Sequence, residues 1–460
     1  MKNIAIQGLG FVGSATAVAV ASRKDKNHKP LFNVMGIDQD NEVGKIRINL
    51  FNSGKFPVKT SDKEIIELTK KSYLAGNLKA SCLVENYSIA SIIISCINLD
   101  LINKNGKLSI SMSSFKKSLK EIADNISKNT LLIIQTTVPP GTCTNIIKPL
   151  FDKTLKKRNM DPNSIFIAHS YERVMPGQNY LNSIINFWRV YSGINDKSAK
   201  KCKAFLSKVI NVDKYPLTKL SSTNASETAK LLENSYRATN IAFIEEWSRF
   251  AEDIGIDLYE VVNAIQKRPT HSNIMKPGFG VGGYCLTKDP LLAKIESTKI
   301  LKLKKHKFDF SSRAVEINNK MPIVTFDKIK KFYKRKISGK NLLLMGITYR
   351  PDIGDTRFSP SEIFYKHAIK NGIKVTAYDP LIDYWEETKL KINKNFPTFI
   401  KYHVVVFAVK SVEYKKINFK NIKPEFNKLL IVDSNNVLSS RQITQIKDNN
   451  FLKFISIGRG

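Results

Sequence analysis

The first half of the chain alternates short apolar runs with longer amphipathic stretches. The apolar runs lie at residues 2–7, 33–38, 91–97 and 130–138, and each is bounded by glycine, proline or polar residues. Runs of this length are typical of buried strands, and a polar, helix-compatible stretch at 113–127 separates the last two. Strands that alternate with helices predict a parallel sheet with helices on both faces.

The middle of the chain changes to a helical period. From about Ser221 to Ile265 apolar residues recur at three- and four-residue spacing, which predicts a long helical element connecting two domains. A lysine-rich helical stretch follows at 299–336, and a second α/β unit then begins. Its strands are expected at 342–349, 374–380, 404–409 and 429–433. We therefore expect an α/β protein with two Rossmann-like, doubly wound parallel-sheet domains joined by a central helical domain with a long connecting helix.

Composition indicates a globular protein and limits its partners. The 460 residues suffice for two or three domains, and 42% of them are hydrophobic. No apolar run approaches a membrane span, and no basic stretch precedes an apolar one at the start, so we expect a cytoplasmic protein without membrane insertion. The formal net charge of +34 would suit nucleic acid, but the lysines are spread along the whole chain, so no nucleic acid partner is expected.

Cysteine and histidine patterns argue against two further kinds of site. The five cysteines are odd in number and lack paired spacing, and the six histidines do not cluster. Neither a disulfide framework nor a metal site is expected.

The first candidate site is the turn after the first strand. Residues 8–13 have the sequence GLGFVG and precede the small-residue helix SATAVAVAS. The first glycine permits the tight turn, the second lets a pyrophosphate approach the backbone, and the third lets the helix pack on the strand. Asp38 ends the second strand, where a carboxylate binds the adenosine ribose and repels a 2′-phosphate, so NAD is expected rather than NADP. The expected cofactor-binding residues are Gly8, Gly10, Phe11, Val12, Gly13 and Asp38.

Two later loops carry polar side chains at the carboxyl ends of strands, where doubly wound sheets bind ligands. The sequence TTVPPGT places Thr136, Thr137 and Thr142 in one loop, and ERVMPG places Glu172 and Arg173 in another. Glu172 is a candidate general acid or base, although an ordinary Glu–Arg surface pair explains the same residues.

The long helical element carries a line of polar residues. Lys230 and Asn234 are four residues apart and therefore share one helical face. Glu227 and Arg237 fall on nearly the same side. These groups could converge on a ligand, and a solvated helix face is the alternative.

The stretch 276–290, KPGFGVGGYCLTKDP, surrounds one cysteine with glycines. Glycines let backbone N–H groups approach a ligand, as a covalent site that holds an oxyanion needs. Lys288 and Asp289 follow Cys285 within one turn, and a neighbouring cation favours the nucleophilic thiolate. A structural cysteine in a glycine-rich loop is the alternative.

A last candidate loop follows the strand at 342–349. It contains Arg350, Asp355 and Arg357 but no GxGxxG sequence, so a second pyrophosphate site of the first kind is not expected. Two arginines beside the carboxyl edge of a sheet suit phosphate oxygens.

Six motifs follow one another along the chain: GLGFVG, TVPPGT, ER followed by glycine, AKLLENSYRATNIAFIEE, GGYCLTKDP and GITYRPDIGDTRFSPS. In this order they resemble the nucleotide-sugar 6-dehydrogenases, the UDP-glucose and GDP-mannose dehydrogenase family. The resemblance implies an NAD-binding Rossmann domain over 1–212, a central helical dimerisation domain with the cysteine loop over 213–336, and a nucleotide-sugar-binding domain over 337–460.

The resemblance also implies a reaction. The primary alcohol of a nucleotide sugar is oxidised to an aldehyde, Cys285 attacks the aldehyde, and a second oxidation gives a thioester that water hydrolyses to the uronic acid. The implied catalytic residues are Cys285, Lys230 and Asn234 for the oxyanion, Asp289 and Glu172 as acid–base groups, and Thr137 for water.

Other matching positions concern the substrate and a partner subunit. The expected substrate contacts are Glu172, Arg173, Lys230, Asn234, Arg268, Phe279, Gly280, Gly282 and Arg350, and Thr137 and Arg357 fall near the cofactor. Arg268 matches an arginine that the neighbouring subunit contributes, so a homodimer is expected. The long helix supports this expectation, because its many apolar residues point in several directions and a partner helix would cover them.

The chain departs from the family pattern at several positions. Tyr284 precedes the cysteine where histidine or serine is usual, Tyr171 replaces the proline before the glutamate, and Asn435 and Asn436 lie where many members have an arginine. The sequence ERVMPG resembles members that act on UDP-N-acetylamino sugars more than those that act on UDP-glucose. We therefore expect a UDP-N-acetylamino sugar as substrate, in surface polysaccharide precursor synthesis, with UDP-glucose as the alternative.

Two other function classes differ in what they require. A β-hydroxyacid or phosphogluconate-type dehydrogenase also joins a Rossmann domain to a helical domain with a lysine and an asparagine, but needs neither Cys285 nor a third domain. A non-catalytic basic binding protein would bind duplex DNA in a salt-dependent way and form no NADH with any nucleotide sugar.

Overall fold

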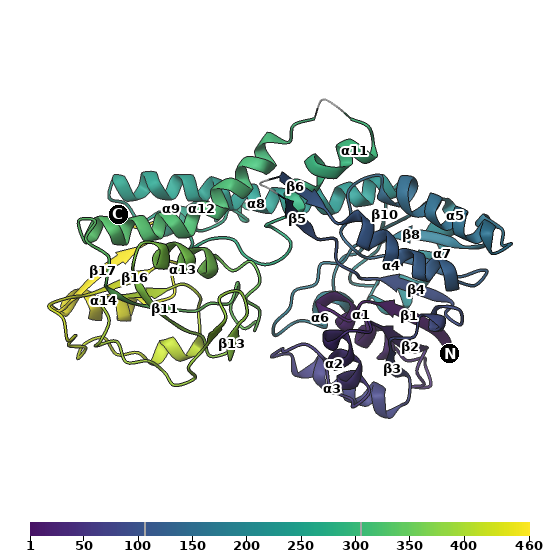
Figure 1. Cartoon of the computed structure of the whole chain (residues 1–460), viewed down its shortest axis with the longest axis horizontal. Coiled ribbons are helices and arrows are strands. Elements are labelled where there is room, and N and C mark those ends of the chain that lie inside the picture. The colour runs from purple at the N-terminus through teal and green to yellow at the C-terminus, as the bar shows by residue number, and fades with distance from the viewer. Residues whose placement is uncertain (105–106, 304–305) are drawn as a thin grey trace. The chain divides into compact units, whose positions relative to one another are not determined.

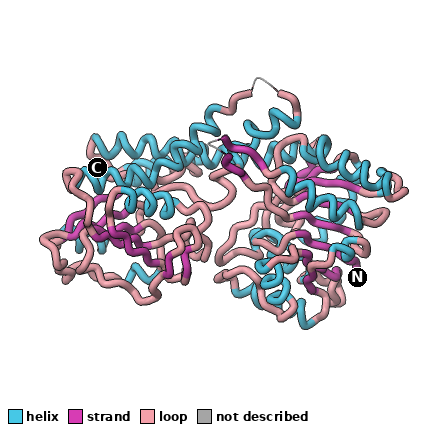
Figure 2. Tube along the Cα trace, in the orientation of Figure 1, coloured by secondary structure: helices cyan, strands magenta, loops and turns pink. Residues whose placement is uncertain are grey.

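The chain forms two compact units in a computed structural model that describes residues 1–104, 107–303 and 306–460 (Figure 1). One unit comprises Met1–Glu233 and Leu292–Lys307, and the other comprises Asn234–Leu291 and Phe308–Gly460. Figure 2 shows the strands of each unit in magenta and its helices in cyan.

An eight-stranded sheet forms the centre of the first unit. Its strands have the order β10-β9-β8-β7-β4-β1-β2-β3 and are parallel except where β9 pairs antiparallel with β8. They are β1 (Lys2–Gln7), β2 (Phe32–Ile37), β3 (Leu78–Ser81), β4 (Ile92–Ser95), β7 (Leu131–Ile134), β8 (Phe166–His169), β9 (Val190–Gly193) and β10 (Thr218–Lys219). Every residue of β4 and β7 is buried, as expected for parallel strands covered on both faces.

Helices cover both faces of this sheet. Val18 of α1 and Phe205 of α7 belong to the apolar cluster on one face, and Phe115 of α4 and Phe151 of α5 belong to the cluster on the other. The helices are α1 (Phe11–Ala21), α2 (Glu42–Phe51), α3 (Lys63–Leu74), α4 (Met112–Asn125), α5 (Lys148–Lys157), α6 (Asn182–Ile185) and α7 (Asp196–Val209). An additional antiparallel hairpin, β5 (Leu101–Lys104) with β6 (Lys107–Ile110), was not among the predicted elements.

The long helical element is two helices instead of one. Helix α8 (Thr223–Asp253) has 31 residues and ends before Gly255, whose φ of +78° suits a glycine just after a helix. Helix α9 (Leu258–Ile265) then starts with Asp257 as its N-cap. The prediction of helix up to Ile265 is therefore corrected at this turn.

A five-stranded parallel sheet forms the second α/β layer, in the second unit. Its order is β12-β11-β15-β16-β17. The strands are β11 (Asn341–Met345), β12 (Lys374–Tyr378), β15 (Val404–Phe407), β16 (Leu429–Asp433) and β17 (Leu452–Ser456). Phe326 of α12 (Asp309–Phe332) and Phe364 of α13 (Pro360–Lys370) pack on one face, and Ile446 of α14 (Ser440–Asp448) packs on the other.

Smaller elements complete the two units: α10 (Asp289–Leu292), α11 (Thr298–Ile300), and the hairpin of β13 (Tyr384–Trp385) with β14 (Leu390–Lys391). Of the helices in the described part of the chain, none combines the length and apolarity of a membrane span. The predicted class, α/β with two largely parallel sheets and a helical region with a long helix, is confirmed.

Residues 458–460 return to the turn between α8 and α9. The Gly458 N–H donates to Glu252 Oε1 at 2.6 Å, and the Gly458 carbonyl accepts from the Leu258 N–H at 2.9 Å. The Gly460 N–H donates to the Ile256 carbonyl at 3.1 Å. This turn is therefore closed by a segment 206 positions later than Glu252.

Candidate active site

The turn between β1 and α1 has the conformation that its glycines predict. Gly8 has a φ of +85°, and its N–H donates to the Ile37 carbonyl at 2.8 Å. A Cβ at Gly13 would lie 1.7 Å from the Gly8 oxygen, whereas a Cβ at Gly10 would meet nothing within 4 Å. Gly13 is thus required for packing, and the open space at Gly10 leaves the N-terminus of α1 accessible to a phosphate.

Asp38 fixes this turn to the end of β2. Its Oδ2 accepts from the Leu9 N–H at 3.1 Å and from Arg47 Nη1 at 3.2 Å, and its Oδ1 accepts from the Gln39 N–H at 2.9 Å. A glycine turn at a helix N-terminus with a carboxylate beside it fits the pyrophosphate and ribose of NAD. Arg47 was not in the expected set.

The three threonines of the loop after β7 differ in the hydrogen bonds of their hydroxyl groups. Thr136 Oγ1 donates to the Ile97 carbonyl at 2.7 Å, and Thr142 Oγ1 donates to the Pro139 carbonyl at 2.5 Å. Thr137 is half-buried and makes no side-chain hydrogen bond to any described residue. Its hydroxyl is therefore the one available to a ligand or to water.

Glu227, near the start of α8, binds the same loop. Its two carboxylate oxygens accept from the N–H groups of Gly141 at 2.7 Å and Cys143 at 2.8 Å. The side chain is fully buried, and this burial raises the pKa of Glu227 to about 7, against the opposing effect of the N–H donors.

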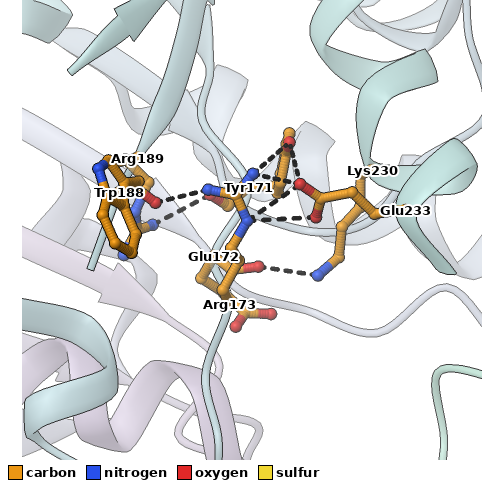
Figure 3. A network of polar contacts seen from close by, with 7 residues as sticks. All are labelled: Tyr171, Glu172, Arg173, Trp188, Arg189, Lys230 and Glu233. Carbon is orange, nitrogen blue, oxygen red and sulfur yellow. Dashed lines mark hydrogen bonds and ion pairs between the residues drawn. The ribbon is translucent and has the colours of Figure 1, made fainter. Parts of the chain in front are cut away.

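The loop after β8 brings Glu172 and Lys230 together (Figure 3). Lys230 Nζ donates to the Glu172 backbone carbonyl at 2.8 Å, and both side chains are buried. The Glu172 carboxylate accepts from the Val174 N–H of its own loop. Arg189 Nη1 donates to the Tyr171 carbonyl at 3.3 Å, and burial lowers the pKa of Arg189 while the Glu172 charge opposes the shift.

Arg173 does not form the surface pair with Glu172 that was considered as an alternative. Its Nε donates to the two carboxylate oxygens of Glu233 at 3.0 and 3.2 Å, and its Nη2 also contacts Glu233. Glu233 is on α8, directly before Asn234. The sequence offered no signal for this pair, because its members are 60 positions apart.

The second unit holds the cysteine loop. Cys285 is exposed, which does not fit a buried structural cysteine, and its carbonyl accepts from the Asp289 N–H at 2.9 Å. Asp289 Oδ1 pairs with Lys288 Nζ at 2.7 Å, and its Oδ2 accepts from Asn234 Nδ2 at 2.7 Å. Lys288, Asp289 and Asn234 are buried, as are Glu227 and Lys230, so these positions of α8 are not on a solvated face. Arg237, expected on nearly the same side, is exposed.

The glycines of this loop allow close approach within the protein itself. A Cβ at Gly282 would lie 2.7 Å from the Tyr349 side chain, and one at Gly280 would lie 2.7 Å from Pro360. Phe279 is buried in the apolar cluster beside α13 and anchors the loop. Tyr349, absent from the expected set, packs against Gly282 and Gly283 of this loop, and burial raises the pKa of Tyr349 to about 12.

The expected arginines differ in their surroundings. Arg350 and Arg268 are exposed, and neither makes a side-chain hydrogen bond or ion pair with any residue that the structure describes. Arg357 pairs with Asp355 at 2.8 Å.

The two asparagines at the end of β16 have partners within the second unit. A Cβ at Gly278 would lie 2.9 Å from Asn435 Oδ1, so Asn435 borders the glycine-rich loop. Asn436 Oδ1 accepts from Arg459 Nη2 at 3.1 Å. Nowhere in residues 1–104, 107–303 and 306–460 do three His, Cys, Asp or Glu side chains gather as a metal site would require.

Comparison with known families matches three successive parts of the chain. Residues 2–210 match the NAD binding domain of the UDP-glucose/GDP-mannose dehydrogenase family, residues 224–320 its central domain, and residues 343–440 its UDP binding domain. The chain belongs to the UDP-glucose/GDP-mannose dehydrogenase family. The resemblance inferred from the six motifs is confirmed, and this dehydrogenase is an NAD-dependent, nucleotide-sugar-oxidising enzyme.

Several relatives are similar to this dehydrogenase in sequence or structure over almost its whole length. The UDP-N-acetyl-D-mannosamine dehydrogenase of Methanocaldococcus jannaschii is 31% identical over 443 residues, which are 95% of this chain and 93% of the relative. The solved structure of the UDP-N-acetyl-D-mannosamine dehydrogenase from Pyrococcus horikoshii has a TM-score of 0.81 at 26% identity and covers 100% of this chain and 99% of the other. A UDP-glucose dehydrogenase from Pyrobaculum islandicum, at 18% identity and a TM-score of 0.79, shares the fold.

Proposed function

We propose that this dehydrogenase oxidises a UDP-N-acetylamino sugar of the UDP-N-acetyl-D-mannosamine class to its uronic acid, in two successive oxidations of one carbon. The similarity to UDP-N-acetyl-D-mannosamine dehydrogenases supports the substrate class. The exposed Cys285, one turn before the buried Asp289–Asn234 pair, carries the proposal for the second oxidation. An alcohol dehydrogenase without a nucleophile would stop at the aldehyde.

Cys285 would form the covalent intermediate. The glycine turn and Asp38 would hold NAD, and each of the two oxidations would transfer one hydride to one NAD molecule. The Cys285 thiolate adds to the aldehyde carbon, and the resulting oxyanion needs fixed donors, which we assign to the Lys230 ammonium and the Asn234 amide. After the second oxidation, water attacks the thioester carbonyl, the C–S bond breaks, and the thiol is released with the acid.

Two carboxylates and a threonine are proposed for the remaining proton transfers. Asp289, held through both carboxylate oxygens, and Glu172 are the proposed acid–base groups, and Thr137 is proposed to position the attacking water. Arg350 lies in the part of the chain that matches the UDP binding domain and is proposed to contact the nucleotide phosphates, with Arg357 near the cofactor. A uronic acid of this class would serve as a precursor of surface polysaccharides.

We also propose a homodimer built on α8 and α9. Phe243, Trp247 and Phe250 are 51%, 47% and 53% exposed, and their rings contact one another along one face of α8. Other apolar residues of α8 are covered within their own units, since Leu231 and Ile244 are buried there. An aromatic stripe of this kind needs a cover, and a second copy in a symmetric arrangement is the simplest one. The exposed Arg268 is proposed to complete the partner's site.

A panel of nucleotide sugars tests the proposed function. UDP-N-acetylmannosamine should give the highest kcat/KM when compared with UDP-N-acetylglucosamine, UDP-N-acetylgalactosamine, UDP-glucose and GDP-mannose. Two NADH should form for each uronic acid. Preference for UDP-glucose would reject the substrate class, and one NADH per turnover with an aldehyde product would reject the second oxidation.

A further inference from the structure

The first turns of α8 carry three charged residues at three-residue spacing, and each binds a different segment of the first unit. Glu227 binds the loop after β7, Lys230 binds the Glu172 carbonyl, and Glu233 binds Arg173. Figure 3 shows the last two contacts side by side. Arg173 directly follows Glu172 in the sequence, and Glu233 lies one helical turn after Lys230 on α8.

Each nitrogen of the Arg173 guanidinium contacts a protein acceptor. Its Nε and Nη2 contact the Glu233 carboxylate, and Nη2 also lies 3.2 Å from the Tyr171 hydroxyl. Its Nη1 donates to the Trp188 carbonyl at 2.6 Å. The Tyr171 hydroxyl in turn donates to Glu233 Oε1 at 3.2 Å. Each of the three guanidinium nitrogens thus has an acceptor or partner within the protein, which suits an anchor better than a ligand for substrate phosphate.

The position of Glu172 depends on these anchors. Strand β8 ends at His169, so no sheet hydrogen bonds hold the backbone of residues 171–173. Tyr171 is held through its carbonyl by Arg189 and through its hydroxyl by Glu233, and Arg173 is held by Glu233. Glu172 lies between these two anchored residues, and its carbonyl is the hydrogen-bond acceptor of the flexible Lys230 side chain.

We propose that Arg173 and Glu233 form a positioning pair, which fixes the loop after β8 on α8 and so sets the location of the Lys230 ammonium. The inference rests on the proposed function for the role of Lys230. The side chains of Arg173 and Glu233 are 24% and 37% exposed, so solvent screens part of the ion-pair energy. The effect of the pair is on geometry, because a displacement of about 1 Å at a catalytic group can lower the rate by about 100-fold.

The test compares kcat, both KM values and the melting temperature for single and double variants. Glu233→Gln and Arg173→Met should each lower kcat by about 10- to 100-fold. The KM for NAD and the melting temperature should stay near the wild-type values. Because the two residues act as one unit, the double variant Arg173→Met/Glu233→Gln should be no worse than either single variant. Asp124→Asn, in the exposed Lys120–Asp124 pair of α4, is the matched control and should leave kcat unchanged.

Other outcomes overturn the inference. If Arg173→Met raises the KM for the sugar nucleotide while Glu233→Gln behaves like the control, Arg173 is a substrate ligand. If both variants melt well below the wild type and lose NAD affinity, the pair is only structural. Wild-type enzyme that is inactive on every sugar of the panel would reject the proposed function and this inference with it, whereas an active wild type with an unaffected Glu233→Gln variant would reject this inference alone.

Discussion

The Glu227 carboxylate accepts a hydrogen bond from the Gly141 N–H at 2.7 Å, although the two residues are 86 positions apart. Burial raises the pKa of this carboxyl from 4.5 to about 7. The folded protein therefore binds the Glu227 proton more tightly than the unfolded chain does. This contribution to stability is fully present below pH 4.5 and is lost as the pH rises through 7.

Replacement of Glu227 by Gln should remove this pH dependence. In the wild type the group should account for a fall of about 3 kcal/mol in the free energy of unfolding between pH 4.5 and 7. The variant should lack that fall, but its amide leaves one loop N–H without an acceptor, at a cost of about 1–3 kcal/mol. Melting temperatures of both proteins between pH 4.5 and 8 check this, and parallel curves would contradict it.

Cys285→Ala should bind NAD and the sugar nucleotide but form no uronic acid. The substitution removes the nucleophile and leaves the glycine turn and the arginines of the second unit intact. Binding can be followed by calorimetry and acid formation by chromatography. Cys82→Ala is the matched control and should have wild-type activity; acid formation by Cys285→Ala at a similar rate would exclude the thioester route.

Asp38→Ser should shift the cofactor preference toward NADP. The wild type should prefer NAD, because repulsion between the Asp38 carboxylate and the 2′-phosphate should lower kcat/KM for NADP by about tenfold or more. Without that carboxylate, Arg47, now 3.2 Å from Asp38, can bind the phosphate, so kcat/KM for NADP should rise. The double variant Asp38→Ser/Arg47→Ala should lose this gain. Equal efficiency of the wild type with both cofactors would refute the assignment.

Trp247→Glu should disrupt the proposed dimer. The substitution places a carboxylate in the centre of the exposed aromatic stripe. A partner subunit that covers the stripe would have to remove water from this charge, which is costly. Light scattering after size-exclusion chromatography should give the mass of one 52.1 kDa chain instead of two. Thr228→Glu, an exposed position on the same helix, should leave the mass of the assembly unchanged. A wild-type protein of one-chain mass would reject the dimer itself.

Arg268 should act in the partner's site. Cys285→Ala and Arg268→Ala subunits, each inactive alone, should regain activity when they exchange, since one site of a mixed dimer is then intact. With equal mixing, half of the dimers are mixed, so about a quarter of the wild-type activity should return. Complete exchange without recovery would place Arg268 in its own subunit's site or outside any site.

Local patterns allowed most of the fold to be predicted. Strands, the glycine turn and the Lys230–Asn234 spacing each depend on residues close in sequence. The break in the long helix was missed because apolar positions continue past Gly255 with nearly the same period. The hairpin of β5 and β6 was also missed, although an Asn-Gly sequence at 105–106 is a signal for one.

Contacts between distant segments could not be predicted in this way. Arg173 and Glu233 are 60 positions apart, and neither residue differs locally from an ordinary surface charge. The buried state of Glu227 likewise follows from loop N–H groups that only the folded chain brings to it. The sequence therefore predicted candidate reactive residues, but not the residues that bind them in the folded chain.

The closure of the α8–α9 turn by residues 458–460 affects how the protein is synthesised. Gly458 leaves the ribosome 206 residues after Glu252, a delay of about 10–40 s at ordinary elongation rates. During that interval the Glu252 carboxylate lacks its Gly458 donor, and the Leu258 N–H lacks its Gly458 acceptor. We expect the turn between α8 and α9 to reach its final structure only after translation of residues 458–460.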